Sequence, residues 1–241
     1  SCFLIFSTDG AASTVSGDVQ TLPEQQPAAR DPWDWGDPVP DGRREWTIIA
    51  FLDGDNNLEQ FVLQDMKEME TGFPGPGTDV IVLLDRSKEY STAMGNWTGT
   101  RAYRLKKYMG EGNIDSELIH DFGELNLGDE AVLEAFLRAA LRKFPAPKNA
   151  LFMWDHGSGW INMANDDDAP GSERKTDEIT LEEFTNALRN SASLLPEGKL
   201  DLIFFDMCLM GQAETVTACA PFARYMVAAA PTIPGVGMDY T

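Results

Sequence analysis

The sequence is poor in the residues that build disulfide frameworks and zinc centres. Its 241 residues include three cysteines and two histidines, and no two cysteines form a C-x-x-C pair. This scarcity excludes a disulfide framework and a Cys/His zinc site of the usual spacing. The sequence also has no run of about eighteen apolar residues, so it predicts no membrane-spanning helix.

Basic residues are scarce as well. Acidic residues outnumber them 39 to 19, which gives a formal net charge of −20. A surface of this sign repels nucleic acid and anionic membranes, and it favours basic peptides or divalent cations as partners. The length suits one large domain with a sizeable core.

The first 44 residues show no period of 2 or 3.6. Pro, Asp, Gln, Ser and Gly are frequent from Asp9 to Arg44, so we predict a disordered tether or pro-region over residues 1–44. Cys2 follows a small residue, as the lipid-bearing Cys of a bacterial lipoprotein does, although no charged and apolar signal segment precedes it. An ordinary exposed Cys in a tail is the alternative. A tether of this kind favours an extracytoplasmic location.

Residues 45–241 alternate between buried strands and amphipathic helices. Strands that alternate with helices form a mainly parallel sheet with right-handed crossovers, so the fold class is α/β. The chain stops after a strand where another helix is expected, and we expect the domain to continue beyond Thr241. Strands are predicted at 46–52, 79–85, 98–105, 114–122, 149–155, 200–206 and 225–230, and helices at 58–72, 128–144, 180–195 and 210–220.

Two of these apolar runs end in a reactive side chain, namely His156 and Cys208. In open parallel sheets the ligand crevice lies beyond the carboxyl ends of the strands. Two neighbouring strands would therefore bring an imidazole and a thiol to one pocket. Gly157 and Gly159, which follow His156, let backbone N–H groups approach a substrate closely.

The other candidate histidine and cysteine lack that context. His120 lies in the segment Glu-Leu-Ile-His-Asp-Phe and is interpreted as an ordinary surface or core residue. Cys219 lies in a helical pattern, where a Cys behaves as a small, unreactive hydrophobic residue. The pair with chemical interest is therefore His156 and Cys208.

Three short motifs resemble the clostripain family of cysteine peptidases, in the caspase-like clan. They follow one another in the family's order, each at a predicted strand end, and the similarity spans residues 46–240. It implies a caspase-like three-layer sandwich with a mainly parallel central sheet, and an endopeptidase that cleaves after Arg or Lys with a His156–Cys208 dyad. The motifs are Asp55-Asn-Asn-Leu-Glu59, Trp154-Asp-His-Gly-Ser-Gly159 and Asp206-Met-Cys-Leu-Met-Gly211.

The chemistry of these residue types agrees with the implied roles. A thiol is only a few per cent ionised at neutral pH, so Cys208 needs a nearby imidazole and a positive field, which the predicted helix 210–220 would supply at its N-terminus. Cys208 would form the acyl-enzyme, and His156 would protonate the leaving amine and then activate water. The N–H groups of Gly157 and Cys208 are the expected oxyanion donors.

Asp206 is the candidate for recognition of a basic side chain. It projects to the same side of its strand as Cys208, and the resemblance makes it the acid of the S1 pocket, where it would pair with Arg or Lys. The alternative is a strand-end Asp that caps the next helix. Asp53 and Asp55, at the end of the neighbouring first strand, would add negative charge to the same pocket.

The resemblance also implies self-cleavage in the loop between the dyad residues. Residues 165–177 form a polar loop that contains Arg174 and Lys175. We predict cleavage after Lys175 or, as the second choice, after Arg174. A simple solvated turn is the alternative.

The predicted mechanism requires no cofactor, and we assign no metal-binding residue. The resemblance leaves Ca²⁺ open, because some relatives depend on it, and the run Asp166-Asp-Asp168 offers the oxygen ligands that Ca²⁺ prefers. Solvated surface charge is the alternative for this run.

Two rival functions remain. One is a caspase-like domain without activity that serves as a tethered binding module, and the other is a metal-dependent hydrolase that uses Asp53 and Asp55. One segment departs from the family pattern. Residues 230–238 lack the acidic residue and the Trp that relatives carry there, which leaves the lining of the pocket on that side undefined.

Overall fold

A computed structural model describes residues 31–40, 44–110 and 113–241 of the chain. Cys2, the candidate lipid-bearing residue, lies outside these residues. Within them, every helix is too short or too polar to cross a membrane.

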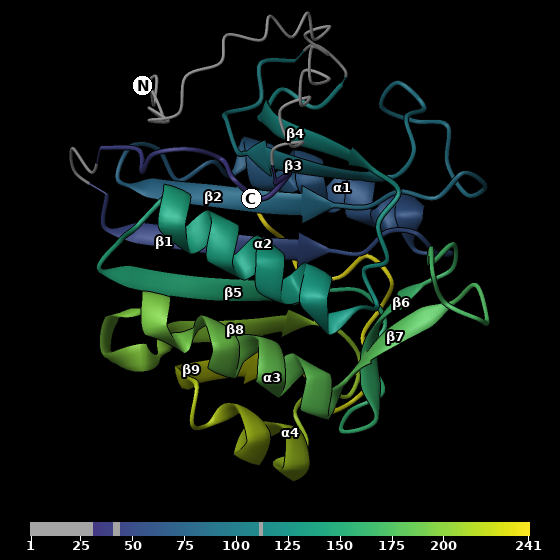
Figure 1. The fold of residues 1–241 in the computed structure, drawn as a ribbon. Coiled ribbons are helices and arrows are strands. Elements are labelled where there is room, and N and C mark those ends of the chain that lie inside the picture. The colour runs from purple at the N-terminus through teal and green to yellow at the C-terminus, as the bar shows by residue number, and fades with distance from the viewer. Residues whose placement is uncertain (1–30, 41–43, 111–112) are drawn as a thin grey trace, which may run out of the picture. The chain divides into compact units, whose positions relative to one another are not determined.

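Seven strands form one sheet in the order β4-β3-β2-β1-β5-β8-β9 (Figure 1). Strands β1, β2, β5, β8 and β9 run parallel, while β3 is antiparallel to both of its neighbours. The mainly parallel sheet is therefore confirmed, and β3 and β4 form an antiparallel pair at its edge. Its strands are β1 (Trp46–Leu52), β2 (Thr78–Leu84), β3 (Thr100–Arg104), β4 (Glu117–Gly123), β5 (Lys148–Trp154), β8 (Leu200–Asp206) and β9 (Ala223–Ala228).

Helices cover both faces of the sheet, which gives three layers. Because side chains alternate along a strand, Ile49 and Phe51 of β1 pack with the buried face of α2 and α3, whereas Ala50 and Leu52 pack with α1. Figure 1 shows α1 behind the sheet and α2 and α3 in front of it. The helices are α1 (Glu59–Thr71), α2 (Glu130–Lys143), α3 (Leu181–Ser191) and α4 (Ala213–Cys219), with 3₁₀ turns at Ala192–Leu194 and Pro196–Gly198.

The predicted tether over residues 1–44 is too long. Trp33 packs on Phe122 with ring centroids 4.2 Å apart, and both Trp33 and Trp35 lie beside Phe136 of α2. Arg44 is buried and forms an ion pair with Asp79. Residues 31–40 and 44 therefore pack on the domain, because burial of two indole rings outweighs the polar composition around them.

Two other local predictions differ from the structure. The polar loop 165–177 is flanked by a hairpin of β6 (Asn162–Asp166) and β7 (Asp177–Thr180), which the sequence pattern did not indicate. The helix predicted at 210–220 begins only at Ala213. By contrast, the predicted start of the helix 180–195 is confirmed, and Thr180 and Glu183 form a capping box there with both of its hydrogen bonds.

Candidate active site

The strands that carry His156 and Cys208 are direct neighbours. β5 and β8 pair in parallel with Trp154 opposite Asp206, so His156 and Cys208 each follow a paired position by two residues. Both side chains line a cavity of about 230 Å³. The imidazole and the thiol therefore lie at one pocket beyond the carboxyl ends of the strands.

Gly157 allows the two strand ends to meet. A Cβ atom at this residue would lie 2.4 Å from the carbonyl oxygen of Cys208 and 2.9 Å from the Cβ of Met207. Both distances are shorter than atoms tolerate, so only glycine fits between His156 and the chain around Cys208.

The imidazole of His156 is held by Asn57. The two side chains share a hydrogen bond of 2.8 Å between Nε2 and the Asn57 Oδ1. Since Oδ1 is an acceptor, Nε2 donates, and Nδ1 is left as the basic nitrogen. Burial lowers the pKa of His156 from its usual value, and the charge of Asp167 offsets part of that effect. The imidazole is therefore neutral near pH 7 and able to accept a proton.

Asn57 belongs to the first motif, but sequence reasoning gave it no role. Its neighbour Asn56 donates from Nδ2 to the buried carboxylate of Asp155 at 2.8 Å. The loop after β1 is thus hydrogen-bonded to two consecutive residues, Asp155 and His156. A pair of amide side chains immediately after a strand was the signal that could have indicated this link.

Cys208 lies in a turn and not at the start of a helix. α4 has seven residues and begins five positions later, at Ala213, so the positive field predicted from its N-terminus is wrong, because such a field fades within the first turn. The partner of the sulfur is instead a backbone group, since the N–H of Ile233 donates to Sγ at 3.4 Å. Leu209 has a positive φ of 64° and donates to the carbonyl of Pro231 at 3.1 Å.

Asp206 lies in the same cavity and is 3% exposed. Its Oδ2 accepts from the N–H of Met238 at 2.9 Å and from the hydroxyl of Tyr240 at 2.8 Å. Its Oδ1 has no hydrogen-bond partner among the described residues. Burial raises the pKa of Asp206, and the two hydrogen bonds oppose that change. The N-cap of α4 is Gln212, so Asp206 does not have the alternative role of a helix cap.

The segment after β9 forms one wall of the cavity. Ile233, Pro234, Gly235 and Gly237 line it. Gly237 has φ +60°, and a Cβ there would lie 2.7 Å from the Asp206 carboxylate. The wall that lacks the family's acid and Trp is thus built from small and apolar residues.

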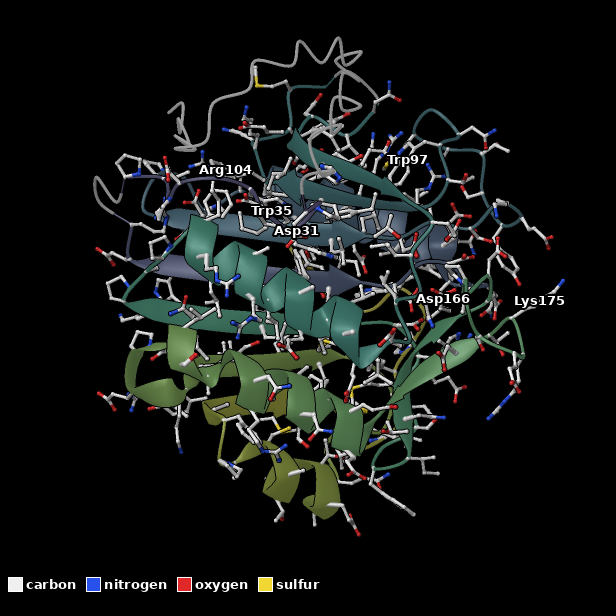
Figure 2. The ribbon with its side chains drawn as sticks, in the orientation of Figure 1. Asp31, Trp35, Trp97, Arg104, Asp166 and Lys175 are labelled. Carbon is white, nitrogen blue, oxygen red and sulfur yellow. The ribbon has the colours of Figure 1, made fainter. Side chains whose placement is uncertain are left out.

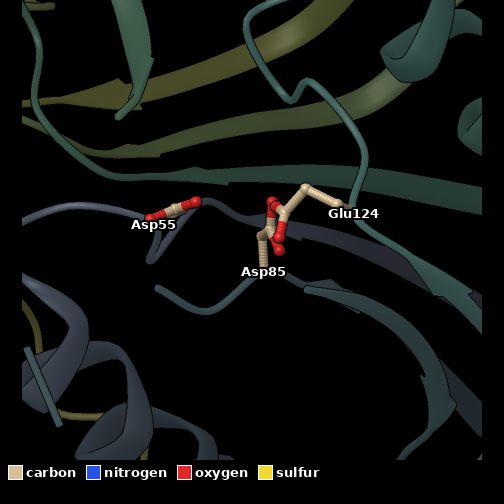
Figure 3. A group of neighbouring side chains, drawn as sticks. All are labelled: Asp55, Asp85 and Glu124. Atoms are coloured by element: carbon tan, nitrogen blue, oxygen red, sulfur yellow. The ribbon is translucent and has the colours of Figure 1, made fainter. Parts of the chain in front are cut away.

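The structure separates Asp53 and Asp55 from this cavity, and their predicted place in the S1 pocket is wrong. Both are fully buried, and neither lines the cavity. Asp55 instead faces Asp85 and Glu124, with one carboxylate oxygen of each within 4.8 Å of the others (Figure 3). The reason is that Gly54 packs closely against the end of β2, which directs the loop toward β2. A Cβ atom at Gly54 would lie only 2.8 Å from the carbonyl oxygen of Asp85.

Arg174 and Lys175 are exposed in the connection between β6 and β7. Lys175 has a positive φ of 65°, and its carbonyl accepts from the N–H of Ala169 at 2.9 Å. Figure 2 shows the Lys175 side chain extending away from the body of the domain. Both bonds that would be cleaved are therefore on the surface.

The acidic run 166–168 does not converge on one point. Asp166 accepts from the N–H groups of Leu127 at 2.7 Å and of Asp168 at 3.0 Å. Asp167 accepts from the Tyr90 hydroxyl at 3.0 Å, and Asp168 pairs with Lys88. Each carboxylate has its own partner, so the run is not a ready cluster of ligands for Ca²⁺.

Comparison with known proteins points to one family. The sequence model of the clostripain family matches residues 50–241. Clostripain of Hathewaya histolytica is 30% identical over 218 residues, which are 80% of this chain and 40% of that protein. The chain therefore spans less than half the length of this relative.

Solved structures share the fold at lower identity. A secreted C11 cysteine protease from Bacteroides thetaiotaomicron, in complex with an irreversible peptide inhibitor, aligns with a TM-score of 0.66 at 23% identity over 82% of this chain and 52% of that one. An inactive zymogen C11 protease from Parabacteroides distasonis aligns with a TM-score of 0.63 at 20% identity, over 84% and 53% of the two chains. The predicted caspase-like α/β fold is thereby confirmed.

Proposed function

The chain belongs to the clostripain family, and we propose that it is a cysteine endopeptidase that cleaves after Arg or Lys. The observation that carries this proposal is the cavity that contains His156, Cys208 and the unpaired Oδ1 of Asp206 together. These groups are a base, a nucleophile and a counter-ion for a basic side chain. Protein or peptide chains with Arg or Lys at P1 are the proposed substrates.

The hydrogen bond between Nε2 of His156 and Asn57 leaves Nδ1 as the nitrogen that can accept the proton of the thiol. With Nε2 bonded to Asn57, Nδ1 of His156 takes the proton of Cys208 as Sγ attacks the scissile carbonyl. The N–H groups of Gly157 and Cys208 would then stabilise the oxyanion. His156 returns the proton to the leaving amine, and in the second half it activates the water that hydrolyses the acyl-enzyme. Every proton and electron pair that moves in these steps is accounted for by Cys208, His156, the substrate and water, so the reaction requires no further group.

Asp206 would supply the preference for a basic P1 side chain. Its Oδ2 is already occupied by Met238 and Tyr240, which fixes the carboxylate in place. The free Oδ1 can accept a charge-assisted hydrogen bond from a guanidinium or ammonium group. A buried carboxylate without a cation is costly, so an incoming Arg or Lys would stabilise its ionised form.

The exposed pair Arg174 and Lys175 would be the site of self-cleavage, with Lys175 first. The positive φ and the hydrogen bond of its carbonyl must be lost before the bond can enter an active site, since a cleaved segment is extended. Opening of this short surface connection costs little because few buried contacts hold it. Location outside the cytoplasm is part of the proposal, and one structural relative is described as secreted.

The test is incubation of the full chain with fluorogenic peptides that carry Arg, Lys or a neutral residue at P1. We expect hydrolysis of the basic substrates only, and none by Cys208→Ala. Intact mass before and after incubation would show a cut after residue 175. Equal rates for the wild type and Cys208→Ala would overturn the dyad and favour the binding module. Activity that survives Cys208→Ala but is lost with a chelator would favour the metal-dependent hydrolase.

For self-cleavage, the matched variant is Lys175→Ala, with Arg174→Ala beside it. If neither the single variants nor the double variant prevents formation of two fragments, the assigned site is wrong. The Cys208→Ala protein, which should remain intact, separates self-cleavage from cleavage by a contaminant.

A further inference from the structure

An indole ring forms part of the wall of the dyad cavity. Trp154 lines this cavity and is 2% exposed. It lies directly opposite Asp206 in the parallel pairing of β5 and β8, and because side chains alternate along each strand, the two project from the same face of the sheet. A substrate side chain that enters the cavity to pair with Asp206 therefore lies beside Trp154.

Asp65 of α1 is the hydrogen-bond partner of this ring. It is 0% exposed, and its Oδ2 accepts from the indole N–H of Trp154 at 2.6 Å. Its Oδ1 is buried and has no hydrogen-bond partner among the described residues, and the same is true of Oδ1 of Asp206. Buried acceptors are almost always satisfied in folded proteins. Trp154 thus adjoins two buried acids, each with an oxygen to which no described group donates.

The two acids have no counter-ion within the described part of the chain. No Lys or Arg of that part lines the cavity, and none of the ion pairs between described residues includes Asp65 or Asp206. Burial raises the pKa of Asp65 to about 7, the hydrogen bond from Trp154 opposes this change, and the charges of Asp206 and Glu68 add to it. The carboxylates of Asp65 and Asp206 are therefore close enough to interact, and both would attract a cation beside Trp154.

We propose that the indole of Trp154 holds the cationic side chain of the P1 residue, and that Asp65 positions this ring and strengthens its attraction for a cation. The inference rests on the proposed function and adds two residues to the recognition of Arg and Lys. A cation beside a Trp is attracted by the negative face of the ring, and the attraction is larger when the cation is desolvated. In this site, Asp206 pairs with the charged end of the P1 side chain while Trp154 contacts its flank.

The hydrogen bond from the indole to Asp65 supports this role in two ways. It fixes the orientation of the ring, since Nε1 is the only polar side-chain atom of a Trp. An ionised acceptor also increases the negative charge on the ring, because hydrogen-bonded groups polarise one another in a low-dielectric interior. Asp65 does not itself line the cavity. It therefore acts through Trp154 and through its charge, without contact with the substrate.

Another buried acid of α1, Glu70, shows how a carboxylate with a structural role is held in this helix. Its Oε1 accepts three hydrogen bonds, from the N–H groups of Asp115 and Ser116 and from the Ser116 hydroxyl, at 2.7 to 2.8 Å. None of these residues lines the dyad cavity. Among the described residues, the donor to Asp65 is Trp154, a residue of the cavity wall. Glu70 is therefore the matched control for Asp65.

The test compares the active full chain with its Asp65→Asn variant, which keeps an acceptor for the indole N–H and removes the charge. With fluorogenic peptides that carry Arg or Lys at P1, we expect KM to rise about 5- to 10-fold and kcat to stay within about 2-fold, because the contact is made in binding. Glu70→Gln should change neither constant. An unchanged KM in Asp65→Asn, or a rise of the same size in Glu70→Gln, would overturn the inference.

Two competing peptides show whether the loss follows the charge of the P1 residue. One ends in Arg and the other in citrulline, the neutral analogue of Arg, and each is measured as an inhibitor of hydrolysis. Asp65→Asn should weaken inhibition by the Arg peptide alone, and an equal loss for both peptides would contradict the proposed role. The proposed function is judged separately, by the activity of the wild type against that of Cys208→Ala.

The pH dependence of KM separates the charge of Asp65 from a structural effect. The titratable groups whose charges act around Asp65 and Trp154 are Asp206, Glu68 and Tyr240, and they are the same in the wild type and in Asp65→Asn. Asp65 has a pKa of about 7, so its carboxylate is mostly protonated at pH 6 and mostly ionised at pH 8. The ratio of the KM of the variant to that of the wild type should therefore be larger at pH 8. Equal ratios at the two pH values would overturn the role of the charge.

A second variant tests whether Asp65 acts through the ring. Trp154→Phe keeps an aromatic face, loses the N–H and should also raise KM for Arg and Lys peptides, because Phe attracts cations less than Trp does. If the two residues act together, the double variant should raise KM by less than the product of the two single effects. A rise equal to that product would show that Asp65 acts independently of Trp154.

Discussion

The carboxyl edge of the sheet has two halves that treat buried charge in different ways. In the dyad half, beyond β5 and β8, the imidazole, the thiol and Oδ2 of Asp206 each have a partner from another segment of the chain. In the acidic half, beyond β1, β2 and β4, each of the three carboxylates has at least one buried oxygen without a hydrogen-bond partner among the described residues. The first half is held in place by hydrogen bonds of the protein itself, whereas the second leaves buried carboxylate oxygens without donors in the described part of the chain.

This difference shows how one sheet topology can provide two kinds of site. Parallel strands deliver polar residues to a common edge whatever their identity. The two halves differ in whether a distant segment of the chain packs on them and donates hydrogen bonds. Residues 231–240 pass over the dyad half and donate backbone and hydroxyl groups. No segment of comparable donors reaches Asp55 and Asp85 in the described part of the chain.

The largest expected difference between the two halves is in the effect of removing the proposed catalytic base, His156. His156→Ala should lower the turnover of an Arg peptide by at least about 1000-fold, because both proton transfers are lost. The control is His120→Ala, which removes the only other His, a residue that packs on Phe122. A similar loss in both variants would mean that the effect is on folding.

Specificity should depend on Asp206 alone among the acids of the edge. Asp206→Asn is expected to lower kcat/KM for Arg and Lys substrates roughly 100-fold, because a desolvated cation loses its counter-ion. Substrates with a neutral P1 residue should change much less. The control is Asp239→Asn, a change of an exposed acid between Met238 and Tyr240, the two residues that bond to Asp206. If Asp55→Asn shifted the P1 preference as strongly, the separation of the two halves would fail.

Asn57 joins the halves, so its replacement tests the link. Asn57→Ala should lower kcat about 10- to 30-fold with little change in KM, because the imidazole loses the partner that orients it. Asn57→Asp retains an acceptor and should recover much of the rate. Its charge would raise the pKa of His156, so the acid limb of the pH profile should move to higher pH. A purely structural role for Asn57 would leave that limb unmoved.

A further prediction concerns stability and not activity, and its subject is Asp65, a buried acid of α1. Its Oδ2 accepts from the indole N–H of Trp154 at 2.6 Å, and burial raises its pKa to about 7. The folded state therefore binds the proton more tightly than the unfolded state, and stability should fall as pH rises from about 4 to about 7. In the Asp65→Asn variant, the free energy of unfolding should fall by about 2 kcal/mol less over this pH range than in the wild type. This figure allows for relaxation of the protein around the charge.

The measurement is urea unfolding at pH 5 and pH 8. The control is Glu45→Gln, a change of an exposed residue. In this variant the difference between the free energies of unfolding at pH 5 and pH 8 should be the same as in the wild type. A variant whose stability declines as much as that of the wild type would show that Asp65 is already ionised at pH 5.

The local elements were within reach of the sequence because they depend on neighbours in the chain. Apolar runs and helical spacing predicted the seven strands of the main sheet and the helices α1, α2 and α3 to within a few residues in most cases. Where the pattern failed, packing from a distance was responsible. Trp33 and Trp35 look like part of a tether until the surface of α2 and Phe122 is present. The residues around Cys208 have a helical pattern, but their backbone is bonded to the segment 229–233.

For the site, the sequence determined which residues carry the chemistry, and the tertiary structure decided which of them meet. Side-chain type and position at a strand end were enough to single out His156, Cys208 and Asp206. The assignment of Asp53 and Asp55 was wrong because the direction of a loop depends on what it packs against, here Gly54 on the end of β2. Asn57 and the cluster of Asp55, Asp85 and Glu124 emerged only in three dimensions, because their partners are distant in the sequence and adjacent only after folding.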